Sequence, residues 1–270
     1  MMFQGKKIFN ASFNAYADDY HEVRPGYLTQ TFCDIKAQCD IREDSRLLEI
    51  GAGSGIATVE LAKFGCNVTA IEPGANLAAI ARKQTAKFNN VEIIEETFEN
   101  FRPIGKFDAV LAFTAFHWID GADKYRKAVE PLKDSGSLVL VWNSFFQDDS
   151  PVTDEVNLIY QKLLPETYGT SSNTGDINQG VLSKLSSRER EICGNDSLYV
   201  VFLNKYLTRY SYDERTYQML LNTFPKIVGI EDAKRREFLA QVSETVKRYG
   251  VISVPVLTTL IVCKKRTSSF

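Results

Sequence analysis

The sequence predicts an open α/β fold, in which a mainly parallel sheet carries helices on both of its faces. Short apolar runs, typical of buried strands, alternate with segments of helical periodicity between residues 46 and 142. A glycine-rich turn, Gly51-Ala52-Gly53-Ser54-Gly55, directly follows the first apolar run, Leu47-Leu48-Glu49-Ile50. An acidic residue, Glu72, ends the second apolar run.

This first strand-turn-helix-strand unit indicates a nucleoside ligand. Glycines permit positive φ in a sharp turn and leave room for a ligand against the backbone. The start of the following helix offers free N–H groups and a partial positive charge. A carboxylate after the second strand, Val68 to Ile71, can accept hydrogen bonds from ribose hydroxyls. Glu72 lies close to the roughly 20-residue interval after the glycines that is typical of a ribose-binding acid.

The glycine spacing argues against a pyrophosphate. The dinucleotide fingerprint is G-x-G-x-x-G, and Ile56 occupies the position of its third glycine, so the pattern here is G-x-G-x-G. The P-loop fits less well, because no Lys-Ser or Lys-Thr pair follows the glycines. A glycine turn without any ligand stays open as an alternative.

Residues 47–55 resemble motif I of the class I S-adenosylmethionine-dependent methyltransferases, and Glu72 matches the ribose-binding acid of that family. The resemblance implies a Rossmann-like fold with a seven-stranded, mostly parallel sheet, an antiparallel last strand and an inserted cap. It also implies S-adenosylmethionine as the cofactor. Motifs of this kind follow along nearly the whole chain.

Composition excludes several classes of protein. The net charge is −2 and acidic and basic residues are interspersed, so nucleic acid is not the expected partner. No apolar run approaches the length of a membrane span, and the N-terminus lacks a signal-peptide core. The five cysteines are scattered, as for free thiols in a cytoplasm, and two histidines argue against a His/Cys metal site. We expect a cytoplasmic monomer or homodimer without a metal ion.

Residues 1–30 precede the sheet and carry aromatic residues at helical spacing, which are broken by Arg24-Pro25-Gly26. Either this segment is a helix packed on the domain or it is a lid over the cofactor. The run from Tyr16 to Tyr27 is similar to the N-terminal segment of many small-molecule methyltransferases. That similarity makes Arg24 a candidate for binding the methionine carboxylate through a bidentate contact.

Further candidates follow later strands. Thr97 and Phe98 come after the third strand, Val91 to Ile94, where the family borders the adenine. Phe98 is equally well explained as a core residue. Ala112 and Phe113 end the fourth strand, and in an open parallel sheet ligands lie beyond the carboxyl ends of the strands. The set expected at the cofactor is Arg24, Glu49, Gly51, Ala52, Gly53, Gly55, Glu72, Pro73, Thr97, Phe98, Ala112 and Phe113.

The run Phe116-His117-Trp118 is similar to the methyltransferase type 11 branch that includes trans-aconitate methyltransferase. Histidine titrates near neutral pH, which makes His117 the candidate catalytic base. The alternative is that His117 and Trp118 pack behind the site.

The predicted cofactor domain comprises residues 31–145 and 198–265, and residues 146–197 are predicted to form an inserted cap that covers the substrate. A surface decoration is the alternative to a cap. Within the insertion we expect a mobile loop at residues 167–179, which are rich in Ser, Thr, Asn and Gly. The last predicted strand, residues 251–263, contains Pro255, which predicts an irregular start or an edge position.

The function implied by the resemblance is in-line methyl transfer to an O-, N- or C-nucleophile of a small molecule, a carboxylate included. Three alternatives stay open: a protein that binds the cofactor without catalysis, a protein or peptide methyltransferase, and an NAD-dependent oxidoreductase.

Overall fold

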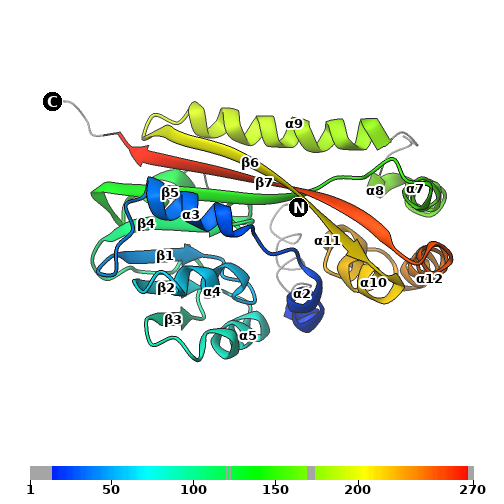
Figure 1. Ribbon diagram of the computed structural model, residues 1–270, viewed down its shortest axis with the longest axis horizontal. Coiled ribbons are helices and arrows are strands. Elements are labelled where there is room, and N and C mark those ends of the chain that lie inside the picture. Colours follow the sequence, from blue (N-terminus) through cyan, green and yellow to red (C-terminus); the bar gives the residue numbers. More distant parts are fainter. Residues whose placement is uncertain (1–13, 120, 122, 169–173, 267–270) are drawn as a thin grey trace. The chain divides into compact units, whose positions relative to one another are not determined.

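The computed structural model describes residues 14–119, 121, 123–168 and 174–266. Seven strands within these residues form one sheet in the order β3-β2-β1-β4-β5-β7-β6, in which the last strand is antiparallel (Figure 1). The strands are β1 (Arg46–Ile50), β2 (Asn67–Ile71), β3 (Val91–Ile94), β4 (Phe107–Phe113), β5 (Leu132–Phe145), β6 (Leu198–Tyr212) and β7 (Ile252–Lys265). The predicted fold class is confirmed.

The helices alternate with the strands and then accumulate after β5. They are α2 (Ala17–Val23), α3 (Thr29–Gln38), α4 (Ile56–Ala62), α5 (Ala75–Thr85), the 3-10 helix η1 (Phe116–Trp118), α6 (Lys124–Val129), α7 (Pro151–Leu163), α8 (Pro165–Tyr168), α9 (Thr174–Cys193), α10 (Glu214–Asn222), α11 (Pro225–Val228) and α12 (Asp232–Tyr249). None of the described helices is both long and apolar enough to cross a membrane.

The chain divides into two compact units. The first unit comprises Met1–Pro25, Ser144–Ser186 and Leu207–Leu257; the second comprises Gly26–Asn143, Ser187–Tyr206 and Thr258–Phe270. The strands β5, β6 and β7 each run from one unit into the other. Compared with the predicted boundaries, Leu207–Leu257 groups with most of the insertion, and residues 187–197 of the insertion group with the predicted cofactor domain.

The second unit has an apolar layer on each face of its strands. Successive residues of β1 point to opposite faces, so that Leu47 belongs to one buried cluster and Leu48 to the other. Helices α3 and α4 contribute Ile35 and Leu61 to the first cluster, and α6 contributes Ala128 to the second. The strand β1 pairs in parallel with both β2 and β4, and the strand order reverses between β1 and β4.

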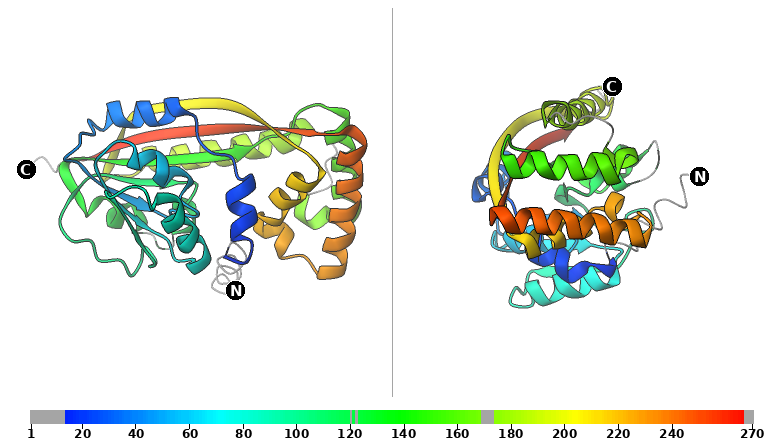
Figure 2. Two further views of the ribbon diagram at one scale, coloured as in Figure 1. Left: turned by 60° about the horizontal axis from the view of Figure 1, so that its bottom comes forward. Right: turned by 90° about the vertical axis from the view of Figure 1, so that its right-hand side faces the viewer.

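The first unit is built around helices, of which α7 and α12 run side by side (Figure 2). The rings of Tyr160 in α7 and Phe238 in α12 lie 4.6 Å apart in its core. Two helices of this unit begin with side-chain caps. Asp213 forms a capping box with Thr216 at the start of α10, and Glu231 accepts two backbone N–H groups at the start of α12.

The predicted loop at residues 167–179 is wrong at both ends, because α8 runs to Tyr168 and α9 begins at Thr174. Ile177, Val181 and Leu185 recur at helical spacing, and Leu185 is buried. The polar composition of this stretch concealed the pattern. Residues 169–173 of the predicted loop, and Phe9 and Phe13 of the N-terminal segment, lie outside the described residues.

The strand that carries Pro255 is not at the edge of the sheet, since β7 lies between β5 and β6. Pro255 has no N–H to donate, but its carbonyl oxygen accepts a hydrogen bond of 2.8 Å from the Phe146 N–H. The edge strand is β6, which alternates half-buried and exposed residues along its length.

Candidate functional site

The glycine turn that follows β1 has three residues in the left-handed region of backbone conformation. The angle φ is 73° at Gly51, 58° at Gly53 and 85° at Gly55, values that are costly for residues with a side chain. A Cβ atom at Gly51 would lie 2.5 Å from the Cβ atom of Ala115, and one at Gly55 would lie 3.1 Å from the Cα atom of Ala81. The protein's own packing therefore requires two of the three glycines, whatever the turn binds.

Glu72, which directly follows β2, ties the glycine turn to the start of α5. One carboxylate oxygen accepts a hydrogen bond of 2.8 Å from the Gly53 N–H, and the other accepts one of 2.8 Å from the Gly74 N–H. Burial raises the pKa of Glu72, and the two N–H donors oppose this shift. Each oxygen keeps a second lone pair, so Glu72 can still accept hydrogen bonds from ligand hydroxyls.

Glu49 lies in β1 just before the turn and is completely buried. Among the described residues neither of its carboxylate oxygens has a hydrogen-bond partner, nor has the nearby Thr58 hydroxyl. Burial raises the pKa of Glu49 to about 7. The Thr58 hydroxyl lies near enough to oppose this shift although it forms no hydrogen bond of normal geometry with Glu49, and the charge of Glu72 adds to the shift. A buried carboxylate without partners is costly, and a ligand that brings a donor or a positive charge would explain it.

The end of β4 lies beside the end of β1, at the change of strand order where α/β sheets bind ligands. The side chains of Ala112 and Phe113 are buried in opposite core clusters, so these two residues can offer only backbone groups to a ligand. The next residue, Thr114, has φ of 54°, a strained conformation for a β-branched side chain. Such strain persists where the surrounding structure holds it and is frequent at functional sites.

Thr114 is held by residues that the sequence reasoning did not select. Its hydroxyl lies 3.1 Å from the Tyr27 hydroxyl and accepts a hydrogen bond of 3.0 Å from the Asn143 N–H. The Asn143 side chain donates to the Gly26 carbonyl oxygen over 3.0 Å and accepts from the Thr258 hydroxyl over 2.6 Å. The sequence signal for Asn143 was a polar residue at the end of an apolar strand, the same signal that identified Glu72.

His117 belongs to the 3-10 helix η1, where its Nδ1 atom accepts a hydrogen bond of 3.3 Å from the Trp142 indole N–H. A neutral histidine that accepts at Nδ1 carries its proton on Nε2. In that arrangement the Nδ1 lone pair already accepts the indole N–H, which makes Nδ1 a poorer acceptor for a substrate proton. The geometry therefore favours the alternative in which His117 packs against its neighbours, and its role as a base stays a prediction.

The remaining candidates of the second unit differ in what they can contribute. Phe98 packs against the core cluster of Leu48, and the Thr97 N–H donates to the Glu96 carboxylate over 2.7 Å. The Ala52 N–H donates to the Ile71 carbonyl oxygen. Pro73 is exposed beside Glu72.

Arg24 belongs to the first unit, not to the unit that contains the glycine turn. Its guanidinium donates to the Thr223 hydroxyl over 2.9 Å and to the Thr223 carbonyl oxygen over 2.8 Å. The same group lies over the ring of Phe224 at 4.7 Å from its centroid. To bind a methionine carboxylate, Arg24 would have to break its hydrogen bonds with Thr223.

Comparison with known proteins agrees with this geometry. Residues 48–140 match the family model of the methyltransferase domain. The chain is 30% identical to a putative methyltransferase of Dictyostelium discoideum, over 60% of this chain and 59% of that protein. It is 28% identical to an uncharacterised methyltransferase of Mycobacterium tuberculosis, over 61% of this chain and 69% of that protein.

Solved structures share the fold. A putative type II methyltransferase from Anaeromyxobacter dehalogenans superposes with a TM-score of 0.60 at 17% identity, over 90% of this chain and 97% of that one. A methyltransferase from Thiobacillus denitrificans, solved with S-adenosyl-L-homocysteine, gives a TM-score of 0.50 at 14% identity, over 93% of this chain and 97% of that one.

Residues 48–140 thus match a methyltransferase domain, and this match and the strand order agree with the S-adenosylmethionine-dependent class predicted from the sequence. The relatives above are themselves named only as putative or uncharacterised methyltransferases, and those names specify no acceptor.

Proposed function

We propose that this chain is an enzyme that transfers the methyl group of S-adenosylmethionine to a small-molecule acceptor. The observation that carries the proposal is the pair of buried carboxylates, Glu49 and Glu72, next to the glycine turn. S-adenosylmethionine carries positive charge on its sulfonium and ammonium groups, which two carboxylates attract. The pyrophosphate of a dinucleotide would instead be repelled by them, which argues against an oxidoreductase.

Different residues of the site suit different groups of the cofactor. Glu72 has free lone pairs for the ribose hydroxyls, in keeping with its place after β2. Glu49 has two carboxylate oxygens without partners, which suit the ammonium group. The turn at residues 51–55 offers a backbone surface with few side-chain atoms to obstruct a ligand.

Catalysis in such a site is mostly a matter of alignment. The bound cofactor supplies an activated methyl group, so the chain has to hold the acceptor in line with it and exclude water. Orientation of this kind is worth up to about 7–11 kcal/mol of the barrier. A carboxylate acceptor needs no base. A hydroxyl or amine acceptor needs one, and the hydrogen bond that Nδ1 of His117 accepts argues against that residue in this role.

Thermal-shift titration tests the cofactor. S-adenosylhomocysteine should raise the melting temperature, because a ligand that binds only the folded state stabilises it, whereas NAD should not. A shift with NAD and none with S-adenosylhomocysteine would overturn the proposal.

Transfer of a labelled methyl group to a cell extract tests the reaction and the class of acceptor. After the extract is fractionated, label should be found in metabolites below the size of peptides. Label confined to polypeptides would contradict the small-molecule acceptor. Cofactor binding without any transfer, in extracts of several sources, would show a binding protein instead of an enzyme.

A further inference from the structure

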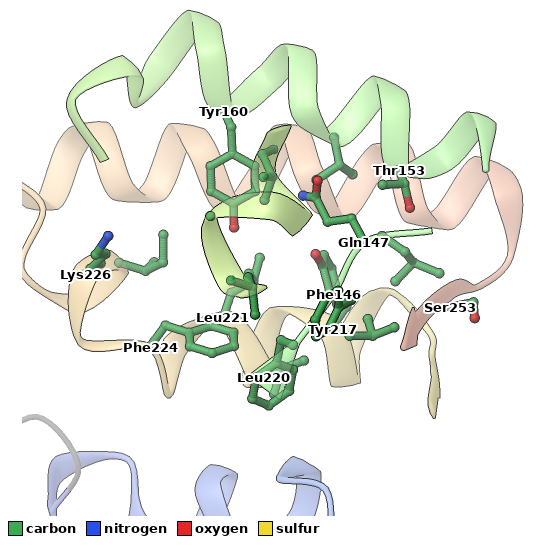
Figure 3. Close-up of a pocket in the computed structure, with 18 of the residues that line it drawn as sticks. Phe146, Gln147, Thr153, Tyr160, Tyr217, Leu220, Leu221, Phe224, Lys226 and Ser253 are labelled. Atoms are coloured by element: carbon green, nitrogen blue, oxygen red, sulfur yellow. The ribbon is translucent and has the colours of Figure 1, made fainter. Parts of the chain in front are cut away.

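The first unit contains a cavity of about 420 Å³ that none of the predicted site residues lines (Figure 3). Its walls come from α7, α9, α10, α11, the end of β5 and the start of β7. The volume falls within the range of about 300–1,000 Å³ that is typical of small-molecule sites. The cavity is therefore large enough to hold a small molecule.

The walls are mainly aliphatic and aromatic. In Figure 3 the ring of Tyr160 points from α7 toward Leu221 of α10, with Leu220 and Phe224 beyond it. Tyr160, Leu220 and Leu221 are buried. Such a lining takes an apolar body in preference to a sugar or a nucleotide.

Two uncharged polar residues of the lining, Gln147 and Thr153, form hydrogen bonds within the protein. The Gln147 side chain exchanges two hydrogen bonds with the Asn157 side chain, of 2.7 and 3.1 Å. The Gln147 backbone exchanges two more with the Asn178 side chain, each of 2.9 Å. The Thr153 hydroxyl donates to Asp148 over 2.7 Å. These two residues therefore have little hydrogen-bonding capacity left for a ligand.

The charged groups of the lining are all positive. Lys184 of α9 and Lys226 of α11 line the cavity, and no Asp or Glu does. Both lysines are exposed residues, which places their charges at the mouth of the cavity rather than in its interior. Neither has an ion-pair partner in the part of the chain that the structure describes.

Arg24 fixes one wall of the same cavity. Its guanidinium lies 5.3 Å from the ring centroid of Phe145 and 4.7 Å from that of Phe224, two lining residues whose rings meet edge to face at 5.2 Å. The hydrogen bonds from Arg24 to Thr223 hold the guanidinium in this place. This arrangement makes Arg24 a positioning residue of the cavity wall.

We propose that this cavity binds the methyl acceptor and that the acceptor is an amphipathic anion, an apolar body with one acidic group. The apolar walls receive the body, and the lysines at the mouth attract the acidic group. The identity of the occupant as acceptor rests on the proposed function. The chain itself supports it, because β5 leads from Asn143, whose backbone N–H donates to the Thr114 hydroxyl, to Phe145 of the cavity wall within two residues.

Gly180 offers a way to fill the cavity without disturbing the fold. It lines the cavity within α9, and a Cβ atom built there would meet no other atom within 4 Å. Gly180→Phe should therefore occupy the space while the helix is kept. Gly180→Ala is the matched control, which adds the helix-favouring methyl group and leaves most of the volume free.

The probes are decanoate and decylamine, which share a body and differ in the sign of their charge, and uncharged decan-1-ol. Decanoate should raise the melting temperature of the wild-type protein and of Gly180→Ala, and decylamine should not. In Gly180→Phe the shift with decanoate should be lost. A doubly substituted Lys184→Met, Lys226→Met protein should bind decanoate about threefold or more weakly and decan-1-ol unchanged. Lys162→Met, an exposed lysine of α7 outside the cavity, is the control.

Equal binding of decylamine and decanoate, or a full decanoate shift in Gly180→Phe, would overturn the proposal. S-adenosylhomocysteine should shift the melting temperature equally in wild-type protein, Gly180→Ala and Gly180→Phe, while Gly180→Phe loses methyl transfer to a cell extract. Decanoate binding without any S-adenosylhomocysteine binding would remove the proposed function and with it the role of the occupant as acceptor. S-adenosylhomocysteine binding with undiminished transfer in Gly180→Phe would remove this proposal alone.

Discussion

At the scale of single residues, the burial of Glu49 couples the stability of the protein to pH. Its pKa in the folded protein is about 7, against 4.5 for an ordinary glutamate. Between these two values the folded state holds a proton that the unfolded state has released. The free energy of unfolding therefore falls as pH rises from 4.5 to about 7, and this contribution is constant above that range.

Glu49→Gln should remove this dependence, because glutamine has a similar size and no ionisable group. The unfolding free energy of the variant minus that of the wild-type protein should rise by on the order of 3 kcal/mol from about pH 5 to about pH 8. Urea unfolding at the two pH values measures the gain. Glu92→Gln, at an exposed position of β3, is the control and should keep the wild-type dependence. An unaltered slope in Glu49→Gln would show that another group titrates.

Glu72→Ala should weaken the binding of S-adenosylhomocysteine by about 1–3 kcal/mol, because ligand hydroxyls lose their acceptor. It should also destabilise the free protein, since the N–H groups of Gly53 and Gly74 lose their partner. Calorimetric titration and urea unfolding separate the two effects. Glu72→Gln keeps one acceptor oxygen and should lie between the wild-type protein and Glu72→Ala. Affinity equal to that of the wild-type protein in Glu72→Ala would exclude Glu72 from the ribose.

At the scale of elements, the glycine turn packs closely against the segment before η1, where Gly51 lies against Ala115. A Cβ atom at Gly51 would lie 2.5 Å from the Cβ atom of Ala115, and φ at Gly51 is positive. Steric overlap and backbone strain therefore both oppose a side chain there, and only the first depends on Ala115.

A double-mutant cycle distinguishes the two causes. Gly51→Ala should destabilise the protein by about 2–4 kcal/mol, the sum of left-handed strain and overpacking. In an Ala115→Gly background the same substitution should cost only about 1–2 kcal/mol, because strain alone remains. Unfolding free energies of the four proteins give the coupling. Additive effects within about 0.5 kcal/mol would show that the two positions do not clash.

The elements differ in how well the sequence predicts them. The unit from β1 to β2 was predicted because strand, glycine turn and acid are each local signals. Helices α10 and α12 begin with local signals too, because the side chains of Asp213 and Glu231 accept backbone N–H groups of the first turn. Helix α9 was predicted only in part, because most residues of its first turns are polar and its few apolar residues pack against segments that are distant in sequence.

At the scale of the whole molecule, the two compact units share the strands β5, β6 and β7. Unfolding of either unit would unpair strands whose continuations belong to the other. We therefore expect a single cooperative thermal transition, with equal calorimetric and van't Hoff enthalpies, despite the division into two units. Differential scanning calorimetry tests this expectation, and two resolved transitions would refute it.

The candidate site was predicted most completely where its residues are close in sequence. Gly53 and Glu72 were selected by their spacing, and the structure joins them by a hydrogen bond. The strained Thr114 and its partners Tyr27 and Asn143 come from three separate segments, and no local pattern links them. The cavity of the first unit draws its lining from still more distant segments.

The sequence by itself determined the class of fold, the glycine turn and the acidic residue after β2, Glu72, because these follow from chain periodicity, residue spacing and the steric freedom of glycine. Only the tertiary structure decided that Glu49 is buried without a partner, that Arg24 binds Thr223, and that an apolar cavity opens within the first unit. Burial and unpaired charge depend on which distant segments meet, and one-dimensional patterns do not contain that information.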